Sequence, residues 1–145
     1  MSNDENLAAL YQERVRYWAA KVRNDRRLVD PEITITRTTP LCGSLLTLDV
    51  KQDSGTILAL GYKARACTLG MASAAIVIEK APGVSFSELR EVQRILGNLL
   101  VGENVIFPVF WEELAIFSAA QAFPTRHGSI MLPFDVLNEA ATKLI

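Results

Sequence analysis

Cys42 and Cys67 are the only thiols in this chain of 145 residues, and both have distinctive neighbours. Cys42 is followed by a glycine and precedes an alternating stretch that predicts a strand. Cys67 lies between a predicted strand and a predicted helix whose first two turns are almost all small residues. Unpaired N–H groups and the positive end of the dipole at such a helix start favour a thiolate. The glycine and small residues beside the thiols leave room for a metal ion or a cluster.

His127 is the only histidine, and a neutral imidazole binds zinc and iron well. The alternative for a lone histidine is an ordinary imidazole in a surface loop. Lys63 and Arg65 precede Cys67 in the sequence. They could lower the pKa of that thiol, or they could form the solvated end of a strand.

The segments that must position these residues predict an α+β fold of a single domain, residues 1–145. Residues 6–24 predict an amphipathic helix, because apolar side chains recur at intervals of three and four. This core-facing stripe consists of Leu7, Leu10, Tyr11, Val15 and Trp18.

Alternation predicts three antiparallel strands over 33–38, 46–50 and 56–63, with hairpin chemistry in the turn between the last two. Thr47 and Asp49 alternate with apolar residues in the middle strand, which is therefore predicted to be half-buried.

The second half of the chain predicts helices over 68–80, from a capping box at Ser85 to about Leu100, over 111–122, and a last one with Pro133 in its first turn. A small three-stranded antiparallel sheet covered by helices, with an N-terminal helix and a helical C-terminal half, is the expected architecture.

Composition excludes several classes of function. The net charge of −1 gives no electrostatic case for binding nucleic acid or an anionic membrane. No apolar run approaches the roughly 20 residues that a membrane span requires. The polar N-terminus differs from a secretory signal, so we expect a cytoplasmic protein. Two thiols in a reducing compartment are expected to be free or metal-bound rather than paired.

The order strand, Cys-Gly, two strands, Cys and small-residue helix resembles the NifU/IscU/SufU family of iron–sulfur cluster assembly scaffolds. The resemblance covers roughly residues 30–142. Members of that family carry Cys-Gly-Asp at the first site, a Cys at the start of a small-residue helix, and a third Cys in a basic-x-x-Cys-x-x-Leu segment. The long stretch 103–123 before the third segment resembles the SufU type.

Two of the four family ligands are replaced in this chain. Ser44 stands where the family has Asp. An ungapped match on Arg126 and Leu132 puts Ser129 at the third Cys, and a shift of one residue would put Gly128 there. Hydroxyls are poor ligands because they do not ionise near neutral pH as a thiol does. The predicted ligands are therefore Cys42, Cys67 and His127.

The resemblance implies a scaffold rather than an enzyme that turns over a small substrate. Such a protein accepts sulfur from a cysteine desulfurase, binds iron or a [2Fe–2S] cluster transiently, and passes it to apo iron–sulfur proteins. A homodimer could supply the missing thiolates, since clusters need about four protein ligands. Zinc is the expected occupant if a metal is retained. The sequence favours Cys67 as the first sulfur acceptor, because of its position at a helix start.

Two alternatives remain. A degenerate relative could keep the fold and bind the desulfurase as an adaptor or regulator, without holding a cluster. A hydrolase with Cys67 as nucleophile and His127 as base is less favoured, because no motif supplies a third orienting group.

Overall fold

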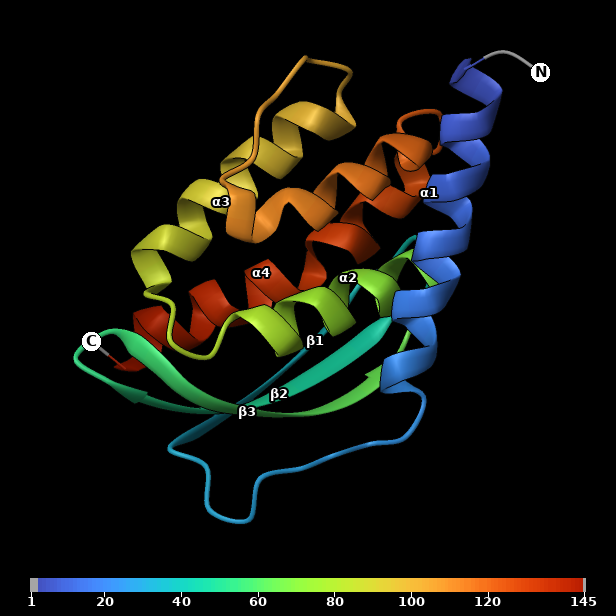
Figure 1. The fold of residues 1–145 in the computed structure, drawn as a ribbon. Helices are drawn as coiled ribbons and strands as arrows, with labels where there is room; N and C mark the ends of the chain where they lie inside the picture. Colours follow the sequence, from blue (N-terminus) through green and yellow to red (C-terminus); the bar gives the residue numbers. More distant parts are fainter. Residues whose placement is uncertain (1–2, 145) are drawn as a thin grey trace.

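Three antiparallel strands form one sheet in the order β1-β2-β3, and the helices cover one of its faces (Figure 1). The computed structural model describes residues 3–144. The strands are β1 (Ile33–Thr38), β2 (Leu45–Asp53) and β3 (Thr56–Arg65). The α-helices are α1 (Asn3–Ala19), α2 (Thr68–Lys80), α3 (Phe86–Leu100) and α4 (His127–Leu144), and the 3₁₀ helices are η1 (Ala20–Val22), η2 (Val109–Ala120) and η3 (Pro124–Arg126). The predicted α+β fold class is confirmed.

Local sequence signals set several of these boundaries. The β2–β3 hairpin turns through Ser54 and Gly55, whose φ angles of 52° and 85° suit the mirror-image turn that matches strand twist. At the start of α3, the Ser85 hydroxyl accepts a hydrogen bond from the Glu88 N–H at 3.0 Å, as the capping box predicts. Both elements form from residues close together in sequence.

The helices form two layers over the sheet. α2 and α4 pack directly on it, α4 against β1 and β2 and α2 against β3. α3 and η2 lie outside them, and α1 stands at the end of the layer where it contacts α2 and η2 (Figure 1). One apolar core joins the sheet, α1 and both helical layers. The start of α2 and the start of α4 are thereby brought to the same end of the molecule.

The middle strand is buried on both faces, so the prediction of a half-buried strand is wrong. Thr47 and Asp49 are 6% and 0% exposed. The chain between α1 and β1 crosses the face that the helices leave open (Figure 1). Arg26 forms a two-way backbone bridge with Tyr62 of β3, with N···O distances of 3.0 and 2.7 Å. This crossing segment covers side chains that alternation alone assigns to solvent.

Asp49 fastens the crossing segment to the sheet. Its carboxylate accepts hydrogen bonds from the Arg27 guanidinium at 2.8 and 2.9 Å, the Leu28 N–H at 2.9 Å and the Thr34 hydroxyl at 2.7 Å. These donors, Arg27 foremost, lower the pKa of Asp49 to about 2, although burial alone would raise it. A Cβ at Gly61 would lie 2.8 Å from the Asp49 Oδ2, so the close crossing requires glycine there.

The N-terminal stripe is only partly buried. Val15 and Trp18 are in the core, but Leu7 and Leu10 are 46% and 49% exposed. α1 also ends five residues earlier than predicted, and η1 completes the segment. The apolar stripe therefore meets the core only in the second half of α1.

The last part of the chain differs from the prediction at two points. Residues 109–120 form 3₁₀ turns rather than an α-helix. Pro133 lies inside α4, which begins six residues earlier at His127. Since proline has no N–H, the Ser129 carbonyl lacks its usual partner four residues on. The early start of α4 carries Ser129 into the interior.

No helix within residues 3–144 is long and apolar enough to cross a bilayer.

Candidate sulfur site

Cys42 lies in the tight loop between β1 and β2. Thr39 closes this loop: its N–H donates to the Ser44 carbonyl at 2.9 Å, and its hydroxyl accepts from the Ser44 N–H at 3.1 Å. Gly43 has a φ of 63°, in the left-handed region that favours glycine, and it turns the chain back toward β2. The Cys-Gly pair thus holds the thiol at the edge of the helical layer, half-buried.

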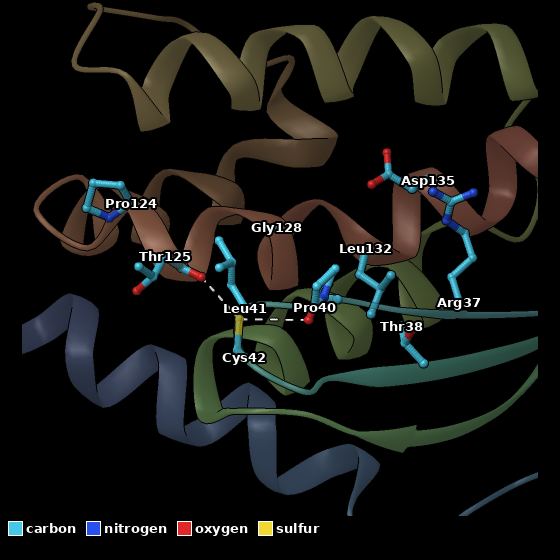
Figure 2. Close-up of a pocket in the computed structure, with 11 residues that line it drawn as sticks. Arg37, Thr38, Pro40, Leu41, Cys42, Pro124, Thr125, Gly128, Leu132 and Asp135 are labelled. Carbon is cyan, nitrogen blue, oxygen red and sulfur yellow. Dashed lines mark hydrogen bonds between the residues drawn. The ribbon is translucent and has the colours of Figure 1, made fainter.

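Hydrogen-bonding groups from its own loop, from η3 and from the start of α4 surround the Cys42 sulfur. Its Sγ lies 3.0 Å from the Ser129 Oγ, and the Ser129 Oγ lies 2.7 Å from the Ser44 Oγ. The thiol donates to the Thr125 carbonyl at 3.1 Å (Figure 2). Both serines are 1% exposed. Cys42, Ser44 and Ser129 stand at three of the four positions where the family that this chain resembles has ligands. These three side chains form one cluster.

These contacts shift the titration of Cys42. The hydrogen bond from Ser129 lowers the pKa of the thiol, and burial opposes it. The Thr39 hydroxyl, at 3.8 Å, and the positive charge of Arg126 lower it further. The Thr125 carbonyl acts the other way, because an acceptor favours the protonated thiol. The net direction is toward a more reactive thiolate.

A cavity of about 220 Å³ opens beside Cys42. Figure 2 shows Cys42, Thr125 and Pro124 on one side of it and Arg37 and Asp135 on the other, with apolar side chains such as Leu132 between them. Arg37 is paired with Glu139 of α4 at 2.8 Å. Because Cys42 is only half-buried and lines this cavity, incoming reagents can reach its thiol from solvent.

Cys67 precedes the first residue of α2 and is half-buried. Its thiol makes no hydrogen bond to the residues that the structure describes, and its side chain does not cap the helix. The start of α2 nevertheless approaches the Cys42 cluster, because a Cβ at Gly70 would lie 3.0 Å from the Ser129 Cβ. Arg65 is paired with Asp25 at 2.8 Å, as expected of a solvated strand end.

His127 is the first residue of α4, and its ring is turned toward η2. The Nε2 lies 2.9 Å from the Ala120 carbonyl. A carbonyl only accepts, so Nε2 carries the proton and donates. This hydrogen bond joins the start of α4 to the end of η2, and it gives His127 a structural role at the junction of these two helices.

The donors at the cluster do not fit zinc or an iron–sulfur cluster. Residues 3–144 contain no group of three or more His, Cys, Asp or Glu side chains that could hold a metal ion. Around Cys42 there are one thiol and two neutral hydroxyls, whereas zinc and clusters take thiolate, imidazole or carboxylate ligands. The predicted set of Cys42, Cys67 and His127 is therefore not preassembled.

The sequence did not single out Thr39 or Thr125 as site residues. A Thr before a proline-containing turn is a known local donor and acceptor for backbone groups, which is a signal for Thr39. No such signal exists for Thr125. Its backbone carbonyl reaches the sulfur only because η3 and the start of α4 fold over the β1–β2 loop.

The fold is similar to that of scaffold-type proteins of iron–sulfur cluster assembly. The chain is 20% identical over 143 residues to the zinc-dependent sulfurtransferase SufU of Bacillus subtilis, covering 99% of this chain and 97% of that one. It is 25% identical over 101 residues to the iron–sulfur cluster assembly scaffold protein IscU of Streptococcus pyogenes, covering 70% of this chain and 64% of that one. No family model matches the chain.

The fold is also similar to the folds of solved structures. An N-terminal NifU-like protein of Brucella abortus superposes with a TM-score of 0.80 at 25% identity, covering 89% of this chain and 90% of that one. A SufU-type protein assigned to the SUF system of Fervidobacterium islandicum superposes with a TM-score of 0.79 at 18% identity, covering 90% and 95%. These matches confirm the resemblance to the NifU/IscU-like scaffold family and its SufU type.

Proposed function

We propose that this protein accepts sulfur from a cysteine desulfurase during iron–sulfur cluster assembly, and that Cys42 is the accepting thiol. The observation that carries the proposal is the setting of Cys42, half-exposed at the mouth of a cavity with hydroxyl donors that lower its pKa. Cys67 has no such donors among the described residues. The acceptor is therefore Cys42 rather than Cys67, which the sequence favoured.

The transfer is a thiol exchange without net oxidation. The Cys42 thiolate attacks the outer sulfur of a persulfide on the desulfurase. The S–S bond of the donor breaks, its cysteine leaves as a thiolate, and a new S–S bond joins the Cys42 Sγ to the transferred sulfur. The proton of the Cys42 thiol passes to solvent or to the leaving thiolate.

Iron and a [2Fe–2S] cluster enter this account as transient cargo destined for apo iron–sulfur proteins. Two cysteines in one chain are fewer than the roughly four ligands that a cluster takes. A second copy of the chain would supply two more. Cluster formation is thus expected to depend on protein concentration, and sulfur acceptance is not.

A second candidate is an adaptor that binds the desulfurase without taking its sulfur. The replacement of two family ligands by Ser44 and Ser129 favours it. The two candidates predict different behaviour of variants in which a thiol is removed.

The test uses a purified cysteine desulfurase with L-cysteine as the sulfur source, under anaerobic conditions. We expect Cys42→Ala to abolish persulfide formation on this protein, and Cys67→Ala to retain most of it. Binding to the desulfurase that persists in both variants, without any persulfide on the wild type, would support the adaptor instead.

A further inference from the structure

We propose that Cys42, Ser129 and Ser44 form a sulfur-accepting centre that works without a metal, in which Ser129 activates the thiol and Ser44 positions Ser129. The inference rests on the proposed function for the identity of the acceptor. It goes further in assigning roles to the two serines that stand at ligand positions of the family.

The direction of the hydrogen bonds follows from the number of protons available. The Cys42 thiol has one proton, and it is directed to the Thr125 carbonyl at 3.1 Å. The Sγ must therefore accept from the Ser129 hydroxyl at 3.0 Å. Ser129 has then used its only proton, so it accepts from Ser44 at 2.7 Å. The chain runs from Ser44 through Ser129 to the sulfur.

Ionisation of Cys42 removes only the last bond, to Thr125. The thiolate still accepts from Ser129, and this hydrogen bond becomes charge-assisted and therefore stronger. Ser44 reinforces it, because a hydroxyl that accepts a hydrogen bond is a better donor. Both serines are 1% exposed, so water does not compete for these hydroxyls.

The packing around Ser129 holds its hydroxyl in place. The backbone of α2 approaches Ser129 closely at Gly70, where an added Cβ would lie 3.0 Å from the Ser129 Cβ. The positive charge of Arg126, which precedes α4, acts on the thiol, and Arg37 and Asp135 line the same cavity. Arg126 favours the thiolate through its charge, Ser129 does so by direct contact with the sulfur, and Ser44 acts through Ser129.

The relative from B. subtilis is zinc-dependent by name. In this chain, hydroxyl donors occupy the places where two metal-binding side chains are expected. They supply stabilisation of a thiolate, which is one effect that a bound metal has on a thiol. They do not supply ligands. Sulfur acceptance is therefore expected to be independent of zinc.

The first experiment tests the metal. Chelator-treated wild-type protein is mixed with inorganic polysulfide, whose sulfane sulfur transfers to Cys42 with release of a shorter polysulfide. A parallel sample is first given one equivalent of zinc and freed of excess metal. We expect equal transfer in both samples. The double variant Ser44→Asp with Ser129→Cys restores the family's donor types, and we expect it to retain zinc through gel filtration where the wild type does not.

The second experiment tests the serines by alkylation of the metal-free protein, followed by peptide mass analysis. We expect Ser129→Ala to slow alkylation of Cys42 at neutral pH about tenfold or more, the effect of one hydrogen bond to a charged group. Ser44→Ala should slow it about two- to threefold. The pH midpoint for Cys42 should rise in both variants. Cys67 in the same molecules is the internal reference, and its rate should not change.

Ser73→Ala is the matched control, because it removes another buried serine hydroxyl, which donates to the Ile130 carbonyl and not to Cys42. Circular dichroism checks that each variant is folded. Transfer that occurs only with zinc would overturn the metal-free centre and leave the acceptor assignment intact. An unchanged Cys42 rate in both folded serine variants would overturn the roles of the serines. Absence of transfer with and without zinc would instead contradict the proposed function.

Discussion

At the scale of single residues, the chemistry depends on contacts between positions far apart in sequence. Cys42 and Ser129 are separated by 87 residues, yet their side chains meet at 3.0 Å. The sequence identified both positions through the spacing of the family's motifs. It did not predict that the serines would bond to the thiol, because this requires the β1–β2 loop and the start of α4 to be in contact.

Asp49 is the residue on which the crossing segment depends most. Its pKa of about 2 lies below the value near 3.9 of an unfolded chain, so its ionised form stabilises the fold above about pH 4. That contribution is lost as the pH falls toward 2. We expect Asp49→Asn to lower the free energy of unfolding at pH 7 by about 2 kcal/mol.

Urea unfolding at a series of pH values measures this effect. The difference between Asp49→Asn and the wild type should shrink between about pH 4 and pH 2. Asp53→Asn is the control on the same strand, since Asp53 is exposed. A constant difference across this range would show that the Asp49 charge is not what holds the crossing segment.

At the scale of elements, the close approach of α2 to α4 controls the position of Ser129. Replacing a helical glycine by alanine usually stabilises a protein by up to about 1 kcal/mol. At Gly70 the new Cβ would lie 3.0 Å from the Cβ atoms of Ala66 and Ser129, which is tighter than ordinary contact. We expect Gly70→Ala to destabilise the fold by about 1 kcal/mol and to slow alkylation of Cys42.

Gly97→Ala in α3 is the matched control. Its new Cβ would meet only the Met131 Cε at 3.5 Å, an ordinary contact. We expect this variant to be as stable as the wild type or slightly more so, with Cys42 unchanged. Equal stability changes at Gly70 and Gly97 would contradict the packing described for α2 and α4.

The docking of α1 depends on one carboxylate of η2. Glu113 accepts hydrogen bonds from the Arg14 guanidinium at 2.6 Å and from the Trp18 indole at 2.8 Å. We expect Glu113→Ala to cost roughly 1–3 kcal/mol and to increase hydrogen exchange in α1 more than elsewhere. The neighbouring Glu112 is exposed, so Glu112→Ala should leave exchange in α1 unchanged. Protection of α1 that is equal in the two variants would refute this role.

The elements that could be predicted are those with local signals. The hairpin at Ser54 and Gly55 and the cap at Ser85 follow from side chains within a few residues of each turn. The burial of Thr47 and Asp49 and the early start of α4 could not be predicted in the same way. Each depends on a segment distant in sequence that covers a strand or packs against a helix.

At the scale of the whole molecule, one apolar core joins the sheet to the helices. The single domain over residues 1–145 remains a prediction, and it implies one cooperative unfolding transition. Trp18 and Trp111 are both buried, in α1 and η2. Their fluorescence and the far-UV circular dichroism should therefore change at the same urea concentration. Two separate midpoints would show that α1 or the helical half unfolds independently.

The most direct test of the whole account is the location of sulfur in metal-depleted wild-type protein after anaerobic reaction with a cysteine desulfurase and L-cysteine. Peptide mass analysis, with the persulfide trapped by alkylation, reads this location. The account predicts one added sulfur atom on the peptide that contains Cys42 and little on the peptide that contains Cys67. Sulfur found only on Cys67, or only after zinc is restored, would contradict it.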